Sequence, residues 1–333
     1  MGSSRIFITG GSGYVGRNLI RQFVGQGHDV LALARSPKSA EVVKSLGAIA
    51  VAGDLFSPDL AAKMAGCSVL IHAAADTDHG RGSEAQRRIN VDGTRAVLEA
   101  AQKAGVAQAI YISTESVLLD GAPLVNADET RPMPAKPAGV YSATKGEAER
   151  LALALNAPGF AVMAVRPRMV WGRDDTTALP QLLAAAHSGQ LAFIDGGKYL
   201  TSTTHIANLC AGIERVIERG RRGEVYFITD GAPIAFRTMV TKLLETQGIT
   251  APDKTVPRWV LRVLVAVGTG LAVVSGGRLQ GPLTLQAYAT SAVEVTLDSG
   301  KAQRELGYQP VISREDGFVE MRTAWTRKWR RQA

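Results

Sequence analysis

Cysteine is scarce in this chain of 333 residues, which contains only Cys67 and Cys210. Two cysteines cannot build a disulfide framework, and neither has the C-x-x-C neighbour or nearby histidine pattern that zinc or redox chemistry needs. The five histidines are scattered and lack carboxylates at ligand spacing, so we expect no metal site. A reducing compartment is the simpler interpretation.

Targeting signals and long apolar runs are lacking as well. The amino terminus reaches a glycine-rich turn within about ten residues, which leaves no space for a signal peptide, so we expect a cytoplasmic protein. The most apolar stretch, Trp259–Ser275, contains Arg262 and two glycines and is short for a membrane span. A lid, a buried helix or a monotopic anchor explains it better, so a peripheral membrane contact stays open.

Acidic residues are outnumbered, with 30 Asp and Glu against 38 Lys and Arg and a net charge of +8. This excess permits attraction to an anionic cofactor or to a lipid surface. No nucleic-acid motif or aromatic-basic platform accompanies it, so we expect no nucleic-acid partner. With 46% hydrophobic and 20% charged residues, the composition excludes disorder, collagen and coiled coil and predicts a soluble globular protein.

Short apolar runs alternate with amphipathic segments along the first half of the chain. This alternation predicts a parallel sheet covered by helices on both faces. The expected strands are Arg5–Thr9, Val30–Ala34, Ile49–Ala52, Val69–Ala73, Ala109–Ser113 and Phe160–Arg166. A long helical segment is expected over Glu84–Lys103, and a loop over the site is expected around Asn126–Ala138.

The turn at Thr9–Gly16 reads TGGSGYVG and lies between an apolar strand and an amphipathic helix. Glycine permits the tight turn and lets the backbone approach a pyrophosphate at the helix N-terminus. The segment therefore predicts an α/β fold with a doubly wound parallel Rossmann sheet of about seven strands. We expect residues 1–166 to form the cofactor domain, and residues 167–333 mainly a smaller α/β substrate domain, with a strand near 224–229 returning to the first sheet.

The end of the second strand predicts the choice of cofactor. It reads Ala34-Arg35-Ser36-Pro37-Lys38, without the acid that would bind the ribose 2′-hydroxyl of NAD. Arg35 is predicted to pair with a 2′-phosphate, which favours NADP(H); the alternative is a solvated loop cation. Asp54, just after the third strand, is expected to accept a hydrogen bond from adenine or to cap the helix that follows.

Tyr141 and Lys145 lie four residues apart at the start of an expected helix. That spacing places both on one helix face, where the ammonium group can approach the nicotinamide ribose and lower the phenol pKa from about 10 toward working pH. Tyr141 would then donate or accept a proton. A Tyr-x-x-x-Lys pair alone is common on helix surfaces and is weak evidence for a catalytic site. In combination with the turn at Thr9–Gly16 and the hydroxyls of Ser113 and Thr114, it becomes specific evidence for one.

Further segments occur in the same order along the chain: Gly53–Leu55 (GDL), His72–Ala75 (HAAA), Asn90–Thr94 (NVDGT), Ile112–Thr114 (IST) and Arg166–Gly172 (RPRMVWG). Together with the two motifs above, they resemble the extended short-chain dehydrogenase/reductase family. Pro282-Leu283-Thr284 and Leu306–Pro310 (LGYQP) make the chain most similar to its 3β-hydroxysteroid dehydrogenase group and to the bacterial reductases of 2-alkyl-3-ketoalkanoic acids.

The resemblance implies a catalytic group of Tyr141 as acid/base, Lys145 as its electrostatic partner, Thr114 bonding the substrate oxygen and Asn90 supporting a proton relay. Ser113 is the weaker alternative to Thr114, because adjacent strand residues point to opposite faces. The implied cofactor-binding residues are Gly10, Gly13, Tyr14, Val15, Gly16, Arg35, Asp54, Leu55, Ala73, Ala74, Ala75, Tyr141, Lys145, Pro167 and Arg168. Arg168 could equally be a salt-bridged surface cation, and His72 and His205 are interpreted as packing residues.

The function expected from this set is reversible hydride transfer between NADP(H) and a ketone or secondary alcohol on a hydrophobic substrate, of the steroid or long-chain β-keto acid type. Sugar-nucleotide epimerase or dehydratase chemistry is an alternative that the apolar Trp259–Ser275 disfavours. A non-catalytic NADP sensor is another, and the intact Tyr141 and Lys145 disfavour it. Trp325 and Trp329, on one helix face among basic residues, leave membrane docking open, and the resemblance implies a homodimer through Glu84–Lys103 and Tyr141–Asn156.

Overall fold

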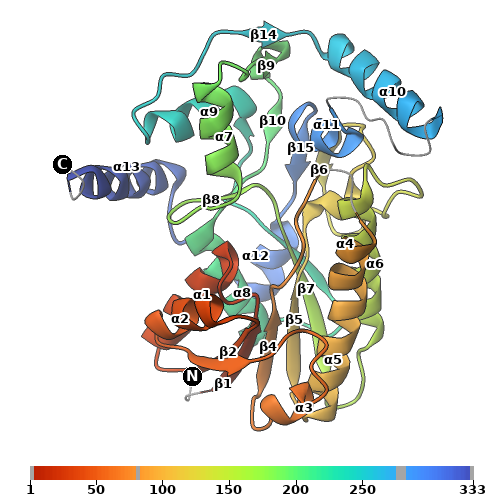
Figure 1. The fold of residues 1–333 in the computed structure, drawn as a ribbon, viewed down its shortest axis with the longest axis vertical. Coiled ribbons are helices and arrows are strands. Elements are labelled where there is room, and N and C mark those ends of the chain that lie inside the picture. The colour runs from red at the N-terminus through yellow and green to blue at the C-terminus, as the bar shows by residue number, and fades with distance from the viewer. Residues whose placement is uncertain (1–3, 80–82, 275–282, 331–333) are drawn as a thin grey trace.

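A parallel sheet of seven strands forms the centre of the computed structural model, which describes residues 4–79, 83–274 and 283–330 (Figure 1). The strand order is β12-β7-β5-β4-β1-β2-β3, and every pairing is parallel. The doubly wound sheet expected from the sequence is confirmed. Its strands are β1 (Arg5–Thr9), β2 (Asp29–Ala34), β3 (Ile49–Ala52), β4 (Val69–His72), β5 (Gln108–Ile112), β7 (Ala161–Pro167) and β12 (Val225–Ile228).

Helices cover both faces of this sheet, which explains why its strands read as continuous apolar runs. Alternate strand residues such as Ile8 and Ile71 pack with one set of helices, and their neighbours Phe7 and Leu70 pack with the other. The first set is α1 (Tyr14–Gly25), α2 (Pro37–Ser45), α8 (Ile206–Arg219) and α12 (Gly300–Leu306). The second set is α3 (Leu60–Lys63), α5 (Gly93–Lys103) and α6 (Val140–Ala154).

The expected continuous helix over Glu84–Lys103 is interrupted. A short helix α4 (Glu84–Arg87) leads into a π-helical turn η1 (Arg88–Asp92), and α5 begins at Gly93. The wider turn contains Asn90, which is buried. A π-helical turn inside a helix is uncommon and occurs often at functional sites. The 3.6-residue periodicity over Glu84–Lys103 does not reveal it.

A second, four-stranded sheet has the order β13-β10-β15-β6 and lies above the carboxyl ends of the large sheet (Figure 1). Its strand β6 (Leu124–Ala127) ends at the start of the loop expected around Asn126–Ala138, and residues 128–138 contain neither helix nor strand, as expected. Strand β12 from the second half lies beside β7 in the large sheet. Each sheet therefore contains a strand from the other half of the chain. The remaining strands of the second sheet are β10 (Leu200–Thr201), β13 (Ile234–Ala235) and β15 (Val295–Leu297).

The described residues of the second half also form two short strand pairs, β8 with β11 and β9 with β14, and five more helices. The pairs are formed by β8 (Val170–Trp171), β11 (Thr204–His205), β9 (Phe193–Ile194) and β14 (Thr255–Val256). The helices are α7 (Ala178–His187), α9 (Phe236–Glu245), α10 (Arg258–Val274), α11 (Leu285–Ser291) and α13 (Arg314–Arg330).

The apolar stretch is helix α10, at the upper edge of the molecule in Figure 1. One side packs on α11 through buried Val265, while Trp259 is 68% exposed. Other large apolar side chains exposed along α10 are those of Val263, Leu264, Val267, Leu271 and Val274. Within the described ranges no helix is both long and apolar enough to cross a bilayer. Ser275 and Pro282, which the sequence analysis used, lie outside those ranges.

Candidate active site

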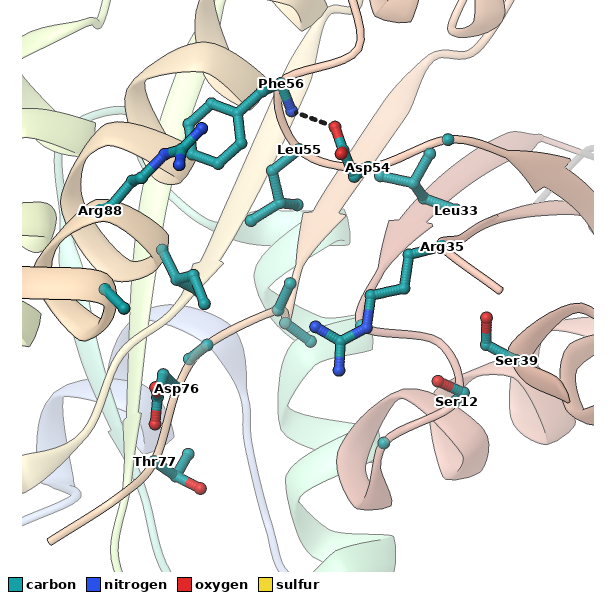
Figure 2. Close-up of a pocket in the computed structure, with 18 of the residues that line it drawn as sticks. Ser12, Leu33, Arg35, Ser39, Asp54, Leu55, Phe56, Asp76, Thr77 and Arg88 are labelled. Atoms are coloured by element: carbon teal, nitrogen blue, oxygen red, sulfur yellow. Dashed lines mark hydrogen bonds between the residues drawn. The ribbon is translucent and has the colours of Figure 1, made fainter. Parts of the chain in front are cut away.

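A cavity of about 870 Å³ lies at the carboxyl ends of β1 to β4, where ligands bind in open parallel sheets (Figure 2). Its walls come from the glycine-rich turn, the ends of β2 and β3, the segment after β4 and the turn that contains Arg88. The lining residues are Gly10, Ser12, Gly13, Leu33, Arg35, Ser39, Gly53, Asp54, Leu55, Phe56, Ala73, Ala74, Ala75, Asp76, Thr77, Asp78, Ala85, Arg88 and Ile89.

The glycine-rich turn is shaped by close backbone contacts. A Cβ on Gly10, whose φ is +70°, would lie 2.7 Å from the carbonyl carbon of Ala73. A Cβ on Gly16 would lie 2.2 Å from the carbonyl oxygen of Gly10, so helix α1 can pack this closely on β1 only with glycine there. Gly13 precedes α1 and lines the cavity, so the free amides of the first helical turn suit a pyrophosphate. A dinucleotide cofactor fits this cradle.

Arg35 extends into the cavity from the end of β2, with Ser12 and Ser39 on the same side (Figure 2). It forms no ion pair within the described part of the chain. Asp54 accepts hydrogen bonds from the amide of Phe56 at 2.9 Å and from the hydroxyl of Ser57 at 3.4 Å. Helix α3 begins only at Leu60, so the expectation that Asp54 caps it was wrong; the carboxylate closes a local turn instead.

Two wall residues were missed by the sequence analysis. The Arg88 guanidinium lies over the Phe56 ring, 4.8 Å from its centre (Figure 2). Both line the cavity opposite Arg35. Phe56 could have been found from its position directly after Gly53-Asp54-Leu55. Nothing in the sequence indicates that Arg88 lies near Phe56.

Tyr141 lies in the first turn of α6, with its side chain buried near the Thr114 hydroxyl. Thr114 lies two residues after the end of β5 and accepts a hydrogen bond from the amide of Ser116. The ring of His79 lies 4.6 Å from the Tyr141 ring. The structure therefore brings together the hydroxyl and the phenol that the sequence assigned to one reaction.

Lys145 lies one turn later and is buried. Its ammonium group donates to the carbonyl oxygen of Ile112 at 2.7 Å and lies 4.2 Å from the centre of the Tyr111 ring. Burial lowers the Lys145 pKa to about 7, and the charge of Glu149 opposes that change.

The phenol pKa moves in the opposite direction from the sequence-based expectation. Burial raises the Tyr141 pKa, and the charge of Glu115 raises it further, while the hydrogen bond with Thr114 lowers it. Lys145 is directed at Ile112 and is not among these causes. In this arrangement Tyr141 therefore holds its proton and can serve as a proton donor.

Arg168 is neither exposed nor part of the cavity wall. It is 2% exposed and forms an ion pair of 2.6 Å with Glu115, so the salt bridge of the alternative interpretation is present, but at a buried position and not at the surface. Pro167, the last residue of β7, is also buried outside the cavity lining. Tyr14, Val15, Gly16, Tyr141 and Lys145 are likewise absent from that lining, whereas the remaining predicted cofactor residues line it.

Asn90 connects the segment after β4 to helix α6. Its amide group donates to the carbonyl oxygen of Asp76 at 3.0 Å and to the Thr144 hydroxyl at 3.2 Å, and its oxygen accepts from the Asp76 amide at 2.8 Å. Ser113 donates to Glu149 at 2.5 Å, away from the partners of Thr114. Asn90 thus positions the residue next to Lys145.

The two histidines have packing partners. His72 is buried between the hydroxyls of Thr9 and Thr94, and burial lowers its pKa to about 3. His205 caps helix α8 by accepting from the amide of Ala207 and packs edge-on against Trp171. In the described ranges, no group of three or more His, Cys, Asp or Glu side chains could hold a metal ion.

A family model described as the 3-beta hydroxysteroid dehydrogenase/isomerase family matches residues 7–258. The chain is 45% identical over 322 residues to a 4-hydroxy-2-methyl-3-oxo-4-farnesyl-3,4-dihydroquinoline-1-oxide ketoreductase of Stigmatella aurantiaca, covering 96% of each chain. It is 30% identical to a 2-alkyl-3-oxoalkanoate reductase of Stenotrophomonas maltophilia, covering 96% of this chain and 99% of the relative.

Solved structures are similar over nearly the whole chain. The crystal structure of gox2253 matches with a TM-score of 0.79 and 28% identity, covering 98% of each chain. A dTDP-glucose 4,6-dehydratase from Streptomyces venezuelae with NAD bound matches with a TM-score of 0.75, covering 97% of each chain, at 24% identity. The second similarity shows a shared fold alone.

Proposed function

The chain belongs to the 3-beta hydroxysteroid dehydrogenase/isomerase family, within the extended short-chain dehydrogenase/reductases, and we propose that it uses NADPH to reduce a ketone on a hydrophobic substrate. Oxidoreductase activity between a ketone and an alcohol is common to its relatives. The observation that carries the proposal is the buried Tyr141 hydroxyl near Thr114, whose raised pKa leaves it a proton to donate to a ketone oxygen.

Support for NADP(H) comes from the end of β2. Arg35 is directed into the cavity, and no carboxylate stands at Ala34-Arg35-Ser36 to bind a ribose 2′-hydroxyl. A guanidinium group suits a phosphate because it can donate two parallel hydrogen bonds. NAD is present in the dehydratase structure above, which is too distant to decide the matter for this chain.

In the proposed reaction the bound nicotinamide supplies the hydride, and the protein supplies position and a proton. The amides at the start of α1 would hold the pyrophosphate, and Arg35 the 2′-phosphate. Tyr141 would donate its proton to the ketone oxygen as the carbonyl carbon is reduced. Lys145 would bind the nicotinamide ribose, and Asn90 would keep α6 in register with the segment after β4.

The relatives and the packing of helices α10 and α11 support an apolar substrate. The two relatives described above are named as a ketoreductase of a farnesyl-bearing compound and as a 2-alkyl-3-oxoalkanoate reductase, so each name states an oxo group and an apolar substituent, farnesyl in one and alkyl in the other. In this chain Gln286 of α11 accepts hydrogen bonds from Ser142, the neighbour of Tyr141, and Arg262 of α10 donates to Tyr288 of α11. We therefore propose that α10 forms the entrance for an apolar substrate and contacts the membrane surface from a cytoplasmic location.

We also propose that residues 1–166, joined by the returning strand β12, form a cofactor domain, and that residues 167–333 form mainly a substrate domain. A homodimer through the helices over Glu84–Lys103 and Tyr141–Asn156 follows from the family resemblance. Light scattering after size exclusion tests this assembly, since a monomeric mass would contradict it.

The test of the function is consumption of NADPH and NADH by the purified protein against 3-ketosteroids, 2-alkyl-3-keto acids and aromatic aldehydes, while UDP-glucose is incubated with the protein and NAD⁺ and its products are analysed directly. We expect turnover of one of the apolar ketones, faster with NADPH. Turnover of UDP-glucose, or NADPH binding without turnover of any compound, would contradict the proposal.

A further inference from the structure

Helix α6 carries Tyr141 in its first turn, yet it has no cap from its own end of the chain. The residue before it, Gly139, supplies no side-chain hydrogen bond to the first turn. Ala143 is the first residue whose amide bonds within the helix, to the Gly139 carbonyl oxygen at 2.9 Å. Ser142, which follows Tyr141, is buried, so its amide needs an acceptor from elsewhere, because a buried amide without a partner is costly.

Gln286 of α11 provides that acceptor from the second half of the chain. Its Oε1 accepts from the Ser142 amide at 3.2 Å and from the Ser142 hydroxyl at 2.8 Å. A backbone amide nitrogen can only donate, so the Gln286 atom that faces it is the oxygen. Gln286 is 2% exposed, and a Cβ on Gly139 would lie 2.9 Å from the Gln286 Cβ. Glycine at this position therefore lets α11 approach the start of α6 closely.

The nitrogen of the same side-chain amide contacts the turn after β5. Gln286 Nε2 donates to the hydroxyl of Ser116, which lies in the 3₁₀ turn η2 (Glu115–Leu118), at 3.2 Å. The backbone amide of Ser116 donates to the Thr114 hydroxyl oxygen at 3.1 Å. One buried side chain therefore connects the residue that follows Tyr141 with the residue that bonds Thr114.

Helix α11 is held in place from two directions. Arg262 of α10 donates to the Tyr288 hydroxyl at 3.0 Å, and the buried Arg168 donates to the carbonyl oxygen of Thr290 at 3.0 Å. Buried side chains of α11 and of η2 also belong to one apolar cluster. The position of Gln286 is thus fixed partly by α10, the helix that we propose as the substrate entrance.

We propose that Gln286 is a positioning residue that caps α6 from the second half of the chain and holds Tyr141 in register with the turn that bonds Thr114. Without Gln286 the Ser142 amide would lack its acceptor, and the first turn of a helix opens more readily when its cap is lost. The inference rests on the proposed function and deepens it, because the helices assigned to substrate entry then also align the proton donor. A glutamine that only joined the two halves of the chain would stabilise the fold without acting through Tyr141.

Amide hydrogen exchange tests the cap without substrate or cofactor. Gln286→Met has a similar length but no acceptor, so exchange at Ser142 should become about 10-fold faster or more, while exchange in the middle of α6 changes less. Gln286→Glu keeps the acceptor oxygens, and the Ser116 hydroxyl can turn to donate, so exchange at Ser142 should stay near the wild-type rate. Gln22→Met is the matched control and should leave Ser142 unchanged, because Gln22 joins two helices on the other face of the large sheet through its bond to Glu214.

Kinetics test whether the cap acts through Tyr141. With the best ketone of the panel, Gln286→Met should lower kcat by roughly 10- to 100-fold at nearly unchanged NADPH affinity. In the Tyr141→Phe background the same substitution should not lower kcat further, because the proton donor that it positions is already absent. Gln286→Glu should keep most of the wild-type kcat.

Gln286→Asn is a second variant, should Gln286→Met fail to fold. It is shorter by one methylene, so its amide no longer reaches Ser142, and the same results are expected. Unchanged exchange at Ser142 in the folded variant would overturn the proposal. An unchanged kcat, or an equal fall of kcat with and without Tyr141→Phe, would overturn it as well. Absence of turnover with every ketone would contradict the proposed function instead, and exchange at Ser142 would then decide on Gln286 alone.

Discussion

The ammonium group of Lys145 donates a hydrogen bond to the carbonyl oxygen of Ile112 at 2.7 Å, inside the protein. Burial lowers the Lys145 pKa from the ordinary 10.5 to about 7. Between these two pH values the unfolded chain binds a proton that the folded chain does not bind. The folded state therefore gains stability from this group as the pH rises from about 7 to about 10.5, and the burial cost is fully present below pH 7.

Lys145→Met should remove this pH dependence. We expect the variant to be more stable than the wild type near pH 7, by on the order of 1 kcal/mol or more, and the difference to shrink at alkaline pH. Urea unfolding of both proteins across this range measures it. Lys103→Met, at an exposed lysine, is the control, and its unfolding free energy should depend on pH as that of the wild type does. If the unfolding free energies of Lys145→Met and the wild type differ by the same amount at every pH, burial of the Lys145 charge does not cost stability.

Thr114 offers a test of the hydroxyl just after β5. Thr114→Ser retains the hydroxyl, its bond to Glu115 and its bond with the Ser116 amide, so it should keep most of the activity. Thr114→Val loses all three, and kcat should fall on the order of 100-fold. The melting temperature of Thr114→Val is compared with that of the wild type, because a lowered value would attribute the loss of activity to disruption of the turn after β5. Equal activity of the two variants would remove Thr114 from the reaction.

Arg35→Ala should weaken NADPH binding far more than NADH binding. A charge-assisted contact contributes about 1.5–3 kcal/mol, so the ratio of the two dissociation constants should change by roughly 10- to 150-fold. Lys38→Ala is the matched control, because Lys38 is exposed three residues away and does not line the cavity. An unchanged ratio for Arg35→Ala would mean that this guanidinium faces solvent when the cofactor is bound.

Helix α10 should control access of large apolar substrates. Leu264→Asp and Leu271→Asp place charges at side chains that are 39% and 43% exposed, so the fold should tolerate them. The KM for long or polycyclic ketones should rise while reduction of a small soluble ketone is spared. Val311→Asp, at an exposed apolar residue elsewhere, should change neither. Equal loss on both substrates with unchanged stability would count against an entrance, and equal loss with a lowered melting temperature would make α10 part of the core.

The large sheet could be predicted from sequence because its strands are buried on both faces and read as apolar runs between amphipathic helices. The expected runs Arg5–Thr9 and Ile49–Ala52 coincide with β1 and β3. The loop expected around Asn126–Ala138 is present over 128–138, but the short strand β6 just before it was not expected, because β6 pairs with β15, about 170 residues later in the chain. Local periodicity carries no information about such a distant partner.

The glycine-rich turn and Arg35 could be assigned from sequence because each role is local. The turn depends on backbone conformation directly after β1, and Arg35 depends on a charge directly after β2. Glu115 and Arg168 could not, because their pairing joins residues 53 positions apart and depends on burial. The direction of the Tyr141 pKa was missed for the same reason. The four-residue spacing between Tyr141 and Lys145 can be read from the sequence. The effect of the Glu115 carboxylate on the Tyr141 pKa depends on how the fold brings the two side chains together.

The central claim is that this chain transfers a hydride from NADPH to a ketone while Tyr141 supplies the proton. NADPH deuterated at both C4 positions tests it most directly, with the product of the best ketone in the panel analysed by mass spectrometry. The account predicts one deuterium on the carbinol carbon with the wild type, and a rate lower by about 10² to 10⁴-fold with Tyr141→Phe at nearly unchanged NADPH affinity. Product without deuterium at that carbon, or a Tyr141→Phe variant that transfers it at the wild-type rate, would contradict the account.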